Sequence, residues 1–255
     1  MATQKYKKLN QLLSSQPPGI VLSSSWLRTQ GYSFELQRQY KKSQWFDAMG
    51  TGALVRHGDQ VDYLGGVYAL QTQLGLSVHP GATTALALQG KAHYLQQSLK
   101  RVQLFGASND TVPSWFVKRN WGVEVDCRLT SFLPHDLGLI EVTHKAFQVK
   151  VSSPARAVME CLYLVPKSQP LIEVYELMES LNNLRPLMVQ HLLEACTSVK
   201  VKRLFLYLAD KADHEWFHHL NLDDVDLGSG KRAIVPHGDY IPKYQITVPK
   251  ELTTA

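Results

Sequence analysis

The spacing of apolar residues in the first quarter of the chain predicts three short helices followed by a hairpin. Residues 4–16 are expected to form the first helix, because their apolar side chains recur at helical spacing until a Pro-Pro-Gly sequence ends the pattern. A second helix is expected within residues 23–33 and a third within residues 33–45. Short apolar runs separated by glycines in residues 45–59 are typical of a β-hairpin. Together these elements predict a winged helix-turn-helix domain over residues 1–60.

The third of these helices is predicted to have one apolar and one basic face. At about 100° per residue, Leu36 and Tyr40 point to one side. The basic residues fall on the other side within an arc of roughly 100°, and they are Arg38, Lys41 and Lys42. The apolar side is expected to pack on the first two helices, which leaves the basic side free to face a DNA groove.

Residues on or near the basic face are the ones that we expect to contact DNA. Arg and Lys side chains reach phosphates and guanine edges, an amide such as Gln37 can read adenine, and a ring such as Phe34 can touch the thymine methyl group. Ser33 is the predicted N-cap of the third helix, and Arg56 ends the hairpin, which is the predicted wing. The predicted DNA-binding residues are Ser33, Gln37, Arg38, Lys41, Lys42 and Arg56.

The positive charge of the chain is concentrated in the same quarter. The whole chain has a net charge of +5. Residues 1–58 hold eight basic and two acidic residues, a net charge of +6, whereas the remainder holds 19 basic and 20 acidic residues. Such asymmetry indicates a basic module that meets a polyanion, joined to a body with another task. The basic quarter lacks the aromatic stacking platform of single-strand RNA binders, which favours duplex DNA.

After residue 60 the pattern predicts strands first and helices later. Two short helices closed by glycine are expected in residues 65–76 and 81–90. Four alternating stretches are expected to be strands of an antiparallel or mixed sheet, namely residues 101–106, 121–129, 137–144 and 146–153. Four helices are expected next, in residues 153–165, 171–181, 185–196 and 198–212. This order predicts an α+β body over residues 61–255, with an open boundary because residues 61–95 can pack with the N-terminal domain.

The last predicted helix carries a polar stripe opposite its broad apolar face. The stripe consists of Lys200, Arg203, Tyr207, Asp210 and Lys211. A polar stripe usually faces solvent, and we expect that here. The alternative is that it holds a phosphate or an acidic partner.

The stretch HEWFHHL contains the His-Glu-x-x-His pattern of zinc peptidases. On an α-helix His214 and His218 would lie on one face, with Glu215 as the general base. A hydrolytic zinc ion needs a third protein ligand, and the extended motif requires Gly and His where Asn221 and Asp224 stand. We therefore predict that the aromatic residues of this stretch anchor it on the core and that it forms no zinc-peptidase site. Adventitious metal binding by His214 and His218 stays open.

The stretch DLGSGKR resembles the end of a phosphate-binding P-loop. That motif requires Gly where Val225 stands and Ser or Thr where Arg232 stands, so a P-loop NTPase is not expected. A basic turn containing Lys231 and Arg232 is the simpler interpretation, and such a turn can still touch an anion. An enzyme that uses a metal or a phosphate through these C-terminal His and basic motifs is the alternative function.

Several classes of protein are disfavoured by composition. No apolar run approaches the roughly 20 residues that span a bilayer, and no secretory leader is visible, so we expect a cytoplasmic protein with no membrane partner. The three cysteines are far apart and form no C-x-x-C pair, which argues against a disulfide framework or a thiolate zinc site.

The chain resembles the AbiE-type antitoxins of bacterial type IV toxin–antitoxin systems, which are tied to abortive infection of phage-infected cells. The resemblance covers roughly residues 5–249. It rests on the N-terminal pieces SWL, GYS and LVR and, more specifically, on VKVKRLFLYLA, DLGSGKR and KYQITVP near the C-terminus. It implies that the winged helix binds inverted repeats in the operon's own promoter and represses it.

The resemblance also implies a second task for the C-terminal domain. That domain would counteract a nucleotidyltransferase-like toxin made from the adjacent gene, and the family implies no catalytic residue and no cofactor. Five residues match the family's basic C-terminal motifs, namely Lys200, Lys202, Arg203, Lys231 and Arg232. Whether these residues contact the toxin, nucleic acid or solvent stays open at this stage.

Overall fold

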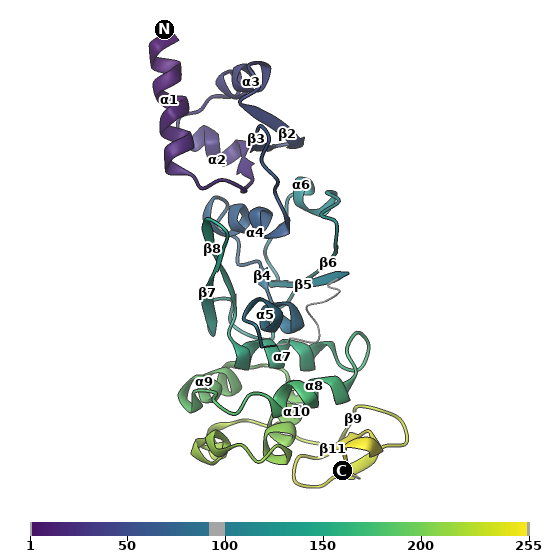
Figure 1. The fold of residues 1–255 in the computed structure, drawn as a ribbon. Helices are drawn as coiled ribbons and strands as arrows, with labels where there is room; N and C mark the ends of the chain where they lie inside the picture. The colour runs from purple at the N-terminus through teal and green to yellow at the C-terminus, as the bar shows by residue number, and fades with distance from the viewer. Residues whose placement is uncertain (1, 92–99, 254–255) are drawn as a thin grey trace.

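The elements of the chain follow one another along a single long axis. The structure is a computed structural model that describes residues 2–91 and 100–253. Figure 1 shows the N-terminal helices at one end of the molecule and the C-terminal strands at the other. Among the described helices, none combines the length and the apolar character that crossing a membrane requires.

The N-terminal end has the predicted arrangement of three helices and a wing. The helices are α1 (Ala2–Ser15), α2 (Ser24–Thr29) and α3 (Phe34–Lys42). The wing is the antiparallel pair β2 (Phe46–Gly50) and β3 (Ala53–Arg56), and the short strand β1 (Leu22–Ser23) pairs with the other edge of β3. This is the order and pairing of a winged helix-turn-helix.

Local chemistry explains why the chain turns between α2 and α3. Gly31 has a φ of +83°, a left-handed conformation that a side chain would strain, and it ends α2. Ser33 then accepts a hydrogen bond from the backbone N–H of Leu36 at 3.3 Å, which caps α3. Tyr40 packs from α3 onto Phe46 of the wing, with ring centroids 5.9 Å apart. The apolar side of α3 therefore faces the body of this domain, as predicted.

Helix α4 (Tyr63–Thr72) is fastened to the N-terminal domain. Its Gly65 accepts a hydrogen bond from the backbone N–H of Val21 at 3.1 Å and lies so close to the carbonyl of Gly19 that a Cβ atom would clash. The side chain of Gln73 bonds both the N–H of Ser23 and the carbonyl of Val21, each at 2.8 Å. The predicted domain boundary at residue 60 stays a prediction, and residues 92–95 of the segment with the open boundary lie outside the described residues.

The four strands predicted in the body form two small sheets, whereas one sheet was expected. Strands β5 (Arg101–Gly106) and β6 (Glu124–Leu129) run parallel, and β4 (His79–Pro80) pairs antiparallel with β5. Strands β7 (Leu139–His144) and β8 (Phe147–Ser152) form a separate hairpin. The side chain of Gln71 in α4 bonds both the N–H and the carbonyl of Lys150 in β8 at 2.9 Å. These backbone groups therefore pair with a side-chain amide and not with the neighbouring strand that was expected.

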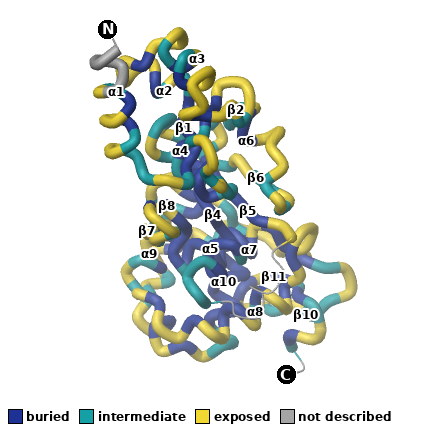
Figure 2. The backbone as a smooth tube through the Cα atoms, turned by 45° about the horizontal axis from the view of Figure 1, so that its top comes forward, coloured by how far each residue is buried: buried dark blue, intermediate teal, exposed yellow. Residues whose placement is uncertain are grey.

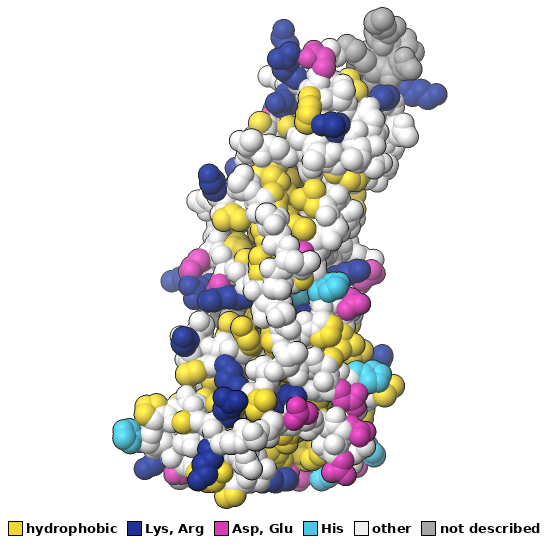
Figure 3. Space-filling view, turned by 180° about the vertical axis from the view of Figure 1, so that it is seen from behind, with side chains coloured by type: hydrophobic (Ala, Val, Ile, Leu, Met, Phe, Trp, Pro, Cys, Tyr) yellow, Lys and Arg dark blue, Asp and Glu magenta, His cyan; other side chains and the backbone are white. Residues whose placement is uncertain are grey.

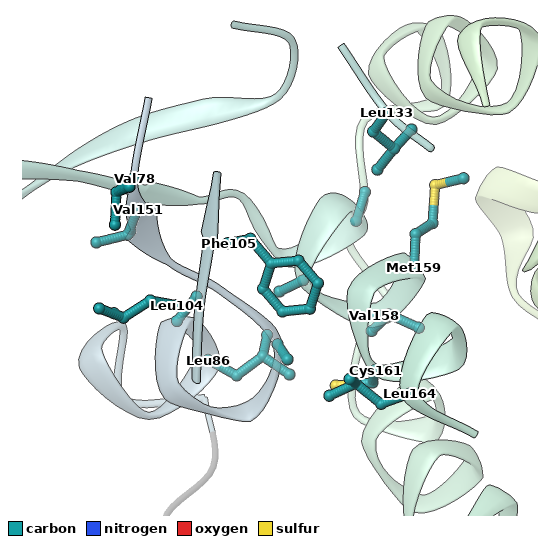
Figure 4. Close-up of a cluster of buried hydrophobic side chains, with 14 of the residues drawn as sticks. Val78, Leu86, Leu104, Phe105, Leu133, Val151, Val158, Met159, Cys161 and Leu164 are labelled. Atoms are coloured by element: carbon teal, nitrogen blue, oxygen red, sulfur yellow. The ribbon is translucent and has the colours of Figure 1, made fainter. Parts of the chain in front are cut away.

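Helices pack on these sheets and on one another to form the main core. They are α5 (Ala82–Leu88), α6 (Ser114–Val117), α7 (Pro154–Leu164), α8 (Leu171–Glu179), α9 (Pro186–Ala195) and α10 (Val199–Lys211). Figure 2 shows that the buried backbone runs through β4, β5, α5, α7 and α10. In Figure 4, Phe105 of β5 points toward Val158 and Cys161 of α7. Burying one such large side chain stabilises the fold by about 1.5–3 kcal/mol.

A buried carboxylate ties the sheets to the helices. Glu160 of α7 is fully buried and accepts hydrogen bonds from His79 (3.2 Å), Arg156 (2.9 Å), Ser152 (2.7 Å) and the backbone N–H of Ala82 (2.9 Å). Burial alone would raise the pKa of Glu160, but the bonds and charges of His79 and Arg156, with the Ser152 bond, outweigh it and lower that pKa. No local sequence pattern points to this network, because its members come from separate elements.

The C-terminal residues form a third small sheet that covers α10. Strands β9 (Arg232–Ala233), β10 (Asp239–Ile241) and β11 (Ile246–Val248) make this sheet, with β11 in the middle. The hydroxyl of Tyr207 in α10 donates to the carbonyl of Leu252 at 3.2 Å. Asp210 accepts hydrogen bonds from Lys243 (2.8 Å) and Tyr244 (2.9 Å). The middle of the polar stripe that was predicted to face solvent therefore lies under the C-terminal segment, at Arg203, Tyr207 and Asp210.

Candidate nucleic-acid interface

Helix α3 presents an exposed basic face at the N-terminal end of the molecule. The side chain of Arg38 is 76% exposed and forms an ion pair of 3.1 Å with Glu35, whose side chain is 61% exposed. Lys41 and Lys42 are exposed, and their side chains make no ion pair or hydrogen bond with any described residue. Ser33 is exposed at the start of the helix, where its side chain already serves as the cap. The face keeps an excess of positive charge.

Gln37 does not belong to the exposed face, which corrects the expectation that it reads a base. It is 4% exposed, and its amide nitrogen donates to the carbonyls of Ser24 (3.1 Å) and Tyr32 (2.8 Å). On a helical wheel Gln37 lies between the apolar and basic sides, so its position alone could not decide its role. It joins α3 to the start of α2 and to the turn.

Arg56 is also committed to the fold, which corrects its assignment to the DNA-contacting wing. Its guanidinium donates to the carbonyls of Leu13, at 2.7 Å, and Gln16 at the end of α1. The last carbonyls of a helix lack partners within the helix, and a cation there satisfies them. Arg56 therefore holds α1 against the wing.

Three further exposed cations lie near α3 or the wing, and no sequence pattern pointed to them. Arg28 is exposed in α2 and lies 5.6 Å from the ring centroid of Phe34, which is itself 57% exposed. Lys118 and Arg119 follow α6, are exposed, and make no ion pair with any described residue. They line a hollow of about 360 Å³ together with Gly50 and other residues of the wing. Nothing in the sequence places residues 118–119 beside the wing, because that proximity depends on the tertiary fold.

Three of the five basic residues singled out in the C-terminal motifs have structural roles. Lys200 donates to the carbonyls of Tyr163 (2.8 Å) and Val165 (2.6 Å) at the end of α7, and burial together with Lys167 lowers the pKa of Lys200. Lys202 is 4% exposed. Lys200, Lys202 and Arg203 therefore do not form an exposed basic surface. This corrects their assignment as contacts for a partner or an anion.

Arg203 lies inside the DLGSGKR loop. It is 1% exposed, and its guanidinium donates to the backbone carbonyls of Leu227, Gly228, Gly230 and Gln245 over 2.6–3.2 Å. Gly228 and Gly230 have φ values of +61° and +77°, which turn the loop around the side chain. The glycines of this motif therefore serve a bound arginine of the same chain, and no phosphate is needed to explain them.

Lys231 and Arg232 are the two predicted C-terminal contact residues that stay exposed. The ammonium of Lys231 lies 5.0 Å from the ring centroid of Tyr240, which is 39% exposed. Arg232 borders a hollow of about 360 Å³ at the start of α10. Together they form a small basic surface at the opposite end of the molecule from α3.

The HEWFHHL stretch does not form the helix that a zinc site requires. Residues Glu215–His219 form a 3₁₀ helix, in which residues four apart do not share a face. His214 is 5% exposed, donates to the carbonyl of Met178 at 2.7 Å and stacks on Trp216, whereas the side chain of His218 is 62% exposed. Trp216 in turn donates to the carbonyl of Leu181 at 2.8 Å. The predicted anchoring role is confirmed for the aromatic residues, and no three His, Cys, Asp or Glu side chains gather as a metal site within the described ranges.

Comparisons with known proteins cover both halves of the chain. Residues 99–249 match the family model described as "Transcriptional regulator, AbiEi antitoxin, Type IV TA system", and residues 5–97 match "Transcriptional regulator, AbiEi antitoxin N-terminal domain". No curated protein matches. The crystal structure of the RV2827C protein from Mycobacterium tuberculosis is similar, with a TM-score of 0.59, 13% sequence identity, and coverage of 96% of this chain and 91% of that chain. At that identity the likeness shows the fold alone.

Proposed function

Because the chain belongs to the family of AbiEi antitoxins, transcriptional regulators of type IV toxin–antitoxin systems, we propose that it binds the promoter of its own operon through α3 and represses transcription. The observation that carries this proposal is the exposed basic face of α3 beside a wing. Figure 3 shows Lys and Arg side chains gathered at the N-terminal end, with few acidic side chains among them. In winged helix-turn-helix proteins this helix enters the major groove.

The proposed DNA contacts divide into two kinds. Phe34 begins α3 and Arg38 lies at its middle, and the N-terminal residues of this helix read base edges in helix-turn-helix proteins. Lys41 and Lys42 at the end of the helix are suited to phosphates, and Ser33 at its start is suited to a backbone contact. Inverted repeats in the promoter would place two copies of the chain on one DNA face, since half-sites mirror the symmetry of a dimer.

We also propose that the C-terminal half counteracts the partner toxin, a nucleotidyltransferase-like protein. Lys231 and Arg232 support a contact there because they are exposed, whereas the other basic residues of the C-terminal motifs are used by the fold. This proposal is tested by the growth of cells that make the toxin together with the full-length antitoxin or its Lys231→Ala/Arg232→Ala variant. Equal rescue by both proteins, at equal antitoxin levels, would remove these residues from the contact.

Promoter binding is tested by fluorescence anisotropy of the full-length protein with duplex DNA from upstream of its own gene. A scrambled duplex of the same length and composition serves as the control, across a salt series. We expect tight, promoter-selective binding whose affinity falls steeply with salt, by about 0.9 in the log–log slope for each neutralised phosphate. Equal affinity for both duplexes at every salt concentration would contradict the proposal.

We assign no catalytic role to the chain. The family consists of regulatory antitoxins. Of the two motifs behind the enzyme alternative, the His-Glu-x-x-His stretch directs His214 into the core and leaves His218 outside. The glycine loop presents carbonyl oxygens to Arg203, which is the wrong polarity for a phosphate.

A further inference from the structure

A hollow of about 390 Å³ opens where two helices of the C-terminal half begin. Its walls include the first residues of α7, the first residues of β7 and the segment that leads into α9. Helices α7 and α9 have 11 and 10 residues, and both begin at this hollow. The N-terminus of a helix carries a partial positive charge and unpaired N–H groups.

The first turn of α7 lacks the cap that its sequence provides. Ser153 stands at the N-cap position and lines the hollow, yet its side chain makes no capping bond. It is 7% exposed, and its hydroxyl has no hydrogen-bond partner among the described residues. Pro154 has no N–H group, and the backbone N–H groups of Ala155 and Arg156 have no acceptor in the described part of the chain. A buried hydroxyl and two N–H donors thus have no protein partner at one place, where an anion could accept their hydrogen bonds.

The charges around the hollow favour an anion. Arg185 and Lys91 line it, and the side chain of neither residue makes an ion pair or a hydrogen bond with a described residue. No Asp or Glu is among the described lining residues. The nearby carboxylate of Glu160 is already balanced by Arg156 and His79.

We propose that this hollow binds the oxyanion group, phosphate or carboxylate, of a small organic ligand. The oxyanion would accept hydrogen bonds from Ser153 and from the N–H groups of Ala155 and Arg156, with Arg185 as its counter-charge. Apolar side chains form the other wall, including Ile140, which is 38% exposed, so the ligand carries an apolar body. The site is distinct from the DNA-binding face, and its failure would leave the promoter-binding proposal intact.

The start of α10 provides an internal comparison. It also borders a hollow with an arginine, Arg232, but there the hydroxyl of Ser198 accepts a hydrogen bond from the N–H of Val201 at 3.4 Å. Its cap is filled by the chain itself, whereas the cap of α7 is empty. Nonspecific attraction of anions to exposed arginines would give binding at both hollows. A specific site formed by the uncapped helix start would give binding only at α7.

The test follows the backbone amide signals of Ala155 and Arg156 by NMR in the full-length protein, at constant ionic strength. The probes are phenyl phosphate, benzoate and the uncharged benzyl alcohol. We expect saturable shifts with phenyl phosphate or benzoate, with a dissociation constant of about 1 mM or lower, and none with benzyl alcohol. Saturation by only one of the two anions would assign the site to phosphate or to carboxylate ligands.

Variants separate the built site from general attraction. Arg185→Gln should weaken binding by roughly tenfold, and Ser153→Ala by roughly fivefold, the usual effect of a charge-assisted and of a single hydrogen bond. Arg232→Gln is the matched control and should leave binding within about twofold. The proposal is overturned by the absence of saturable shifts up to about 50 mM probe, by equal shifts with benzyl alcohol, or by equal weakening in Arg185→Gln and Arg232→Gln.

Discussion

At the scale of the residue, Arg203 shows how one buried cation organises a glycine-rich loop. A P-loop turns its N–H groups toward a phosphate, whereas the DLGSGKR loop turns its carbonyls toward a guanidinium. The two loops share glycines because both must bend tightly around a charged group. Here the enclosed charge is positive, because α10 places the guanidinium of Arg203 inside the loop.

Replacing Arg203 with Ala should therefore destabilise the C-terminal sheet. The substitution leaves several buried carbonyls without a donor, and we expect a loss of about 3 kcal/mol in the free energy of unfolding. Urea denaturation followed by circular dichroism measures it. The matched control is Arg232→Ala, an exposed arginine, which should change stability by no more than about 0.5 kcal/mol. Comparable losses in the two variants would show that the carbonyl contacts do not hold the loop.

Gln37 illustrates how a polar residue on a DNA-facing helix can serve the fold instead. Gln37→Ala should lower the free energy of unfolding by about 1–3 kcal/mol, because the carbonyls of Ser24 and Tyr32 lose their donor. The promoter-to-scrambled affinity ratio of the folded protein should stay within about twofold of the wild type. Gln30→Ala, at an exposed glutamine, is the control for stability. A variant of normal stability that has lost promoter selectivity would return Gln37 to the role of a base reader.

At the scale of the element, the Glu160 network connects parts of the chain that sequence patterns treat separately. The partners of this one carboxylate come from β4, β8, α5 and α7. A carboxyl group whose pKa is lowered by folding stabilises the protein above the ordinary pKa of a glutamate and loses that effect as the pH falls. Acid should therefore loosen the junction between the sheets and α7.

The expected pH dependence can be isolated with Glu160→Gln. At pH 7 the variant should be less stable than the wild type by about 3 kcal/mol, because Arg156 loses its buried counter-charge. This difference should begin to shrink as the pH falls below about 4.3, the ordinary pKa of a glutamate, and should continue to shrink down to the lower pKa of Glu160 in the folded protein. Urea denaturation from pH 7 to pH 3 measures it, with Glu251→Gln at an exposed position as the control. A difference that is constant across this range would refute the assignment of a lowered pKa to Glu160.

The segment after α6 places two exposed cations beside the wing. Lys118→Ala/Arg119→Ala should weaken binding to promoter and scrambled duplexes alike and reduce the log–log salt slope by about 1.8, if each cation neutralises one phosphate. Lys231→Ala/Arg232→Ala changes the same residue types at the far end of the molecule and is the control. An unchanged salt slope in the first variant would exclude residues 118–119 from the interface.

At the scale of the whole molecule, sequence patterns predicted most elements but not which surfaces the fold would leave open. Helical and alternating spacing located α7, α8, α9 and α10 and the strands β5 to β8, since local periodicity reflects burial on one side. The same reasoning misplaced the polar stripe of α10, because the covering sheet comes from residues 232–248 and has almost no periodic signal. Gln37 and Arg56 were misassigned for a related reason. Their side chains bond backbone carbonyls of other elements, which only the tertiary fold brings close.

The central claim is that α3 carries the DNA-binding face and that the C-terminal basic surface does not. The most direct measurement is the promoter affinity of two full-length variants with matched charge loss, Arg38→Ala/Lys41→Ala and Lys231→Ala/Arg232→Ala, by fluorescence anisotropy across a salt series. The α3 variant should lose at least about tenfold in affinity and about 1.8 in the log–log slope, whereas the C-terminal variant should stay within about twofold of the wild type. Equal losses in both variants, or a loss confined to the C-terminal variant, would contradict the account.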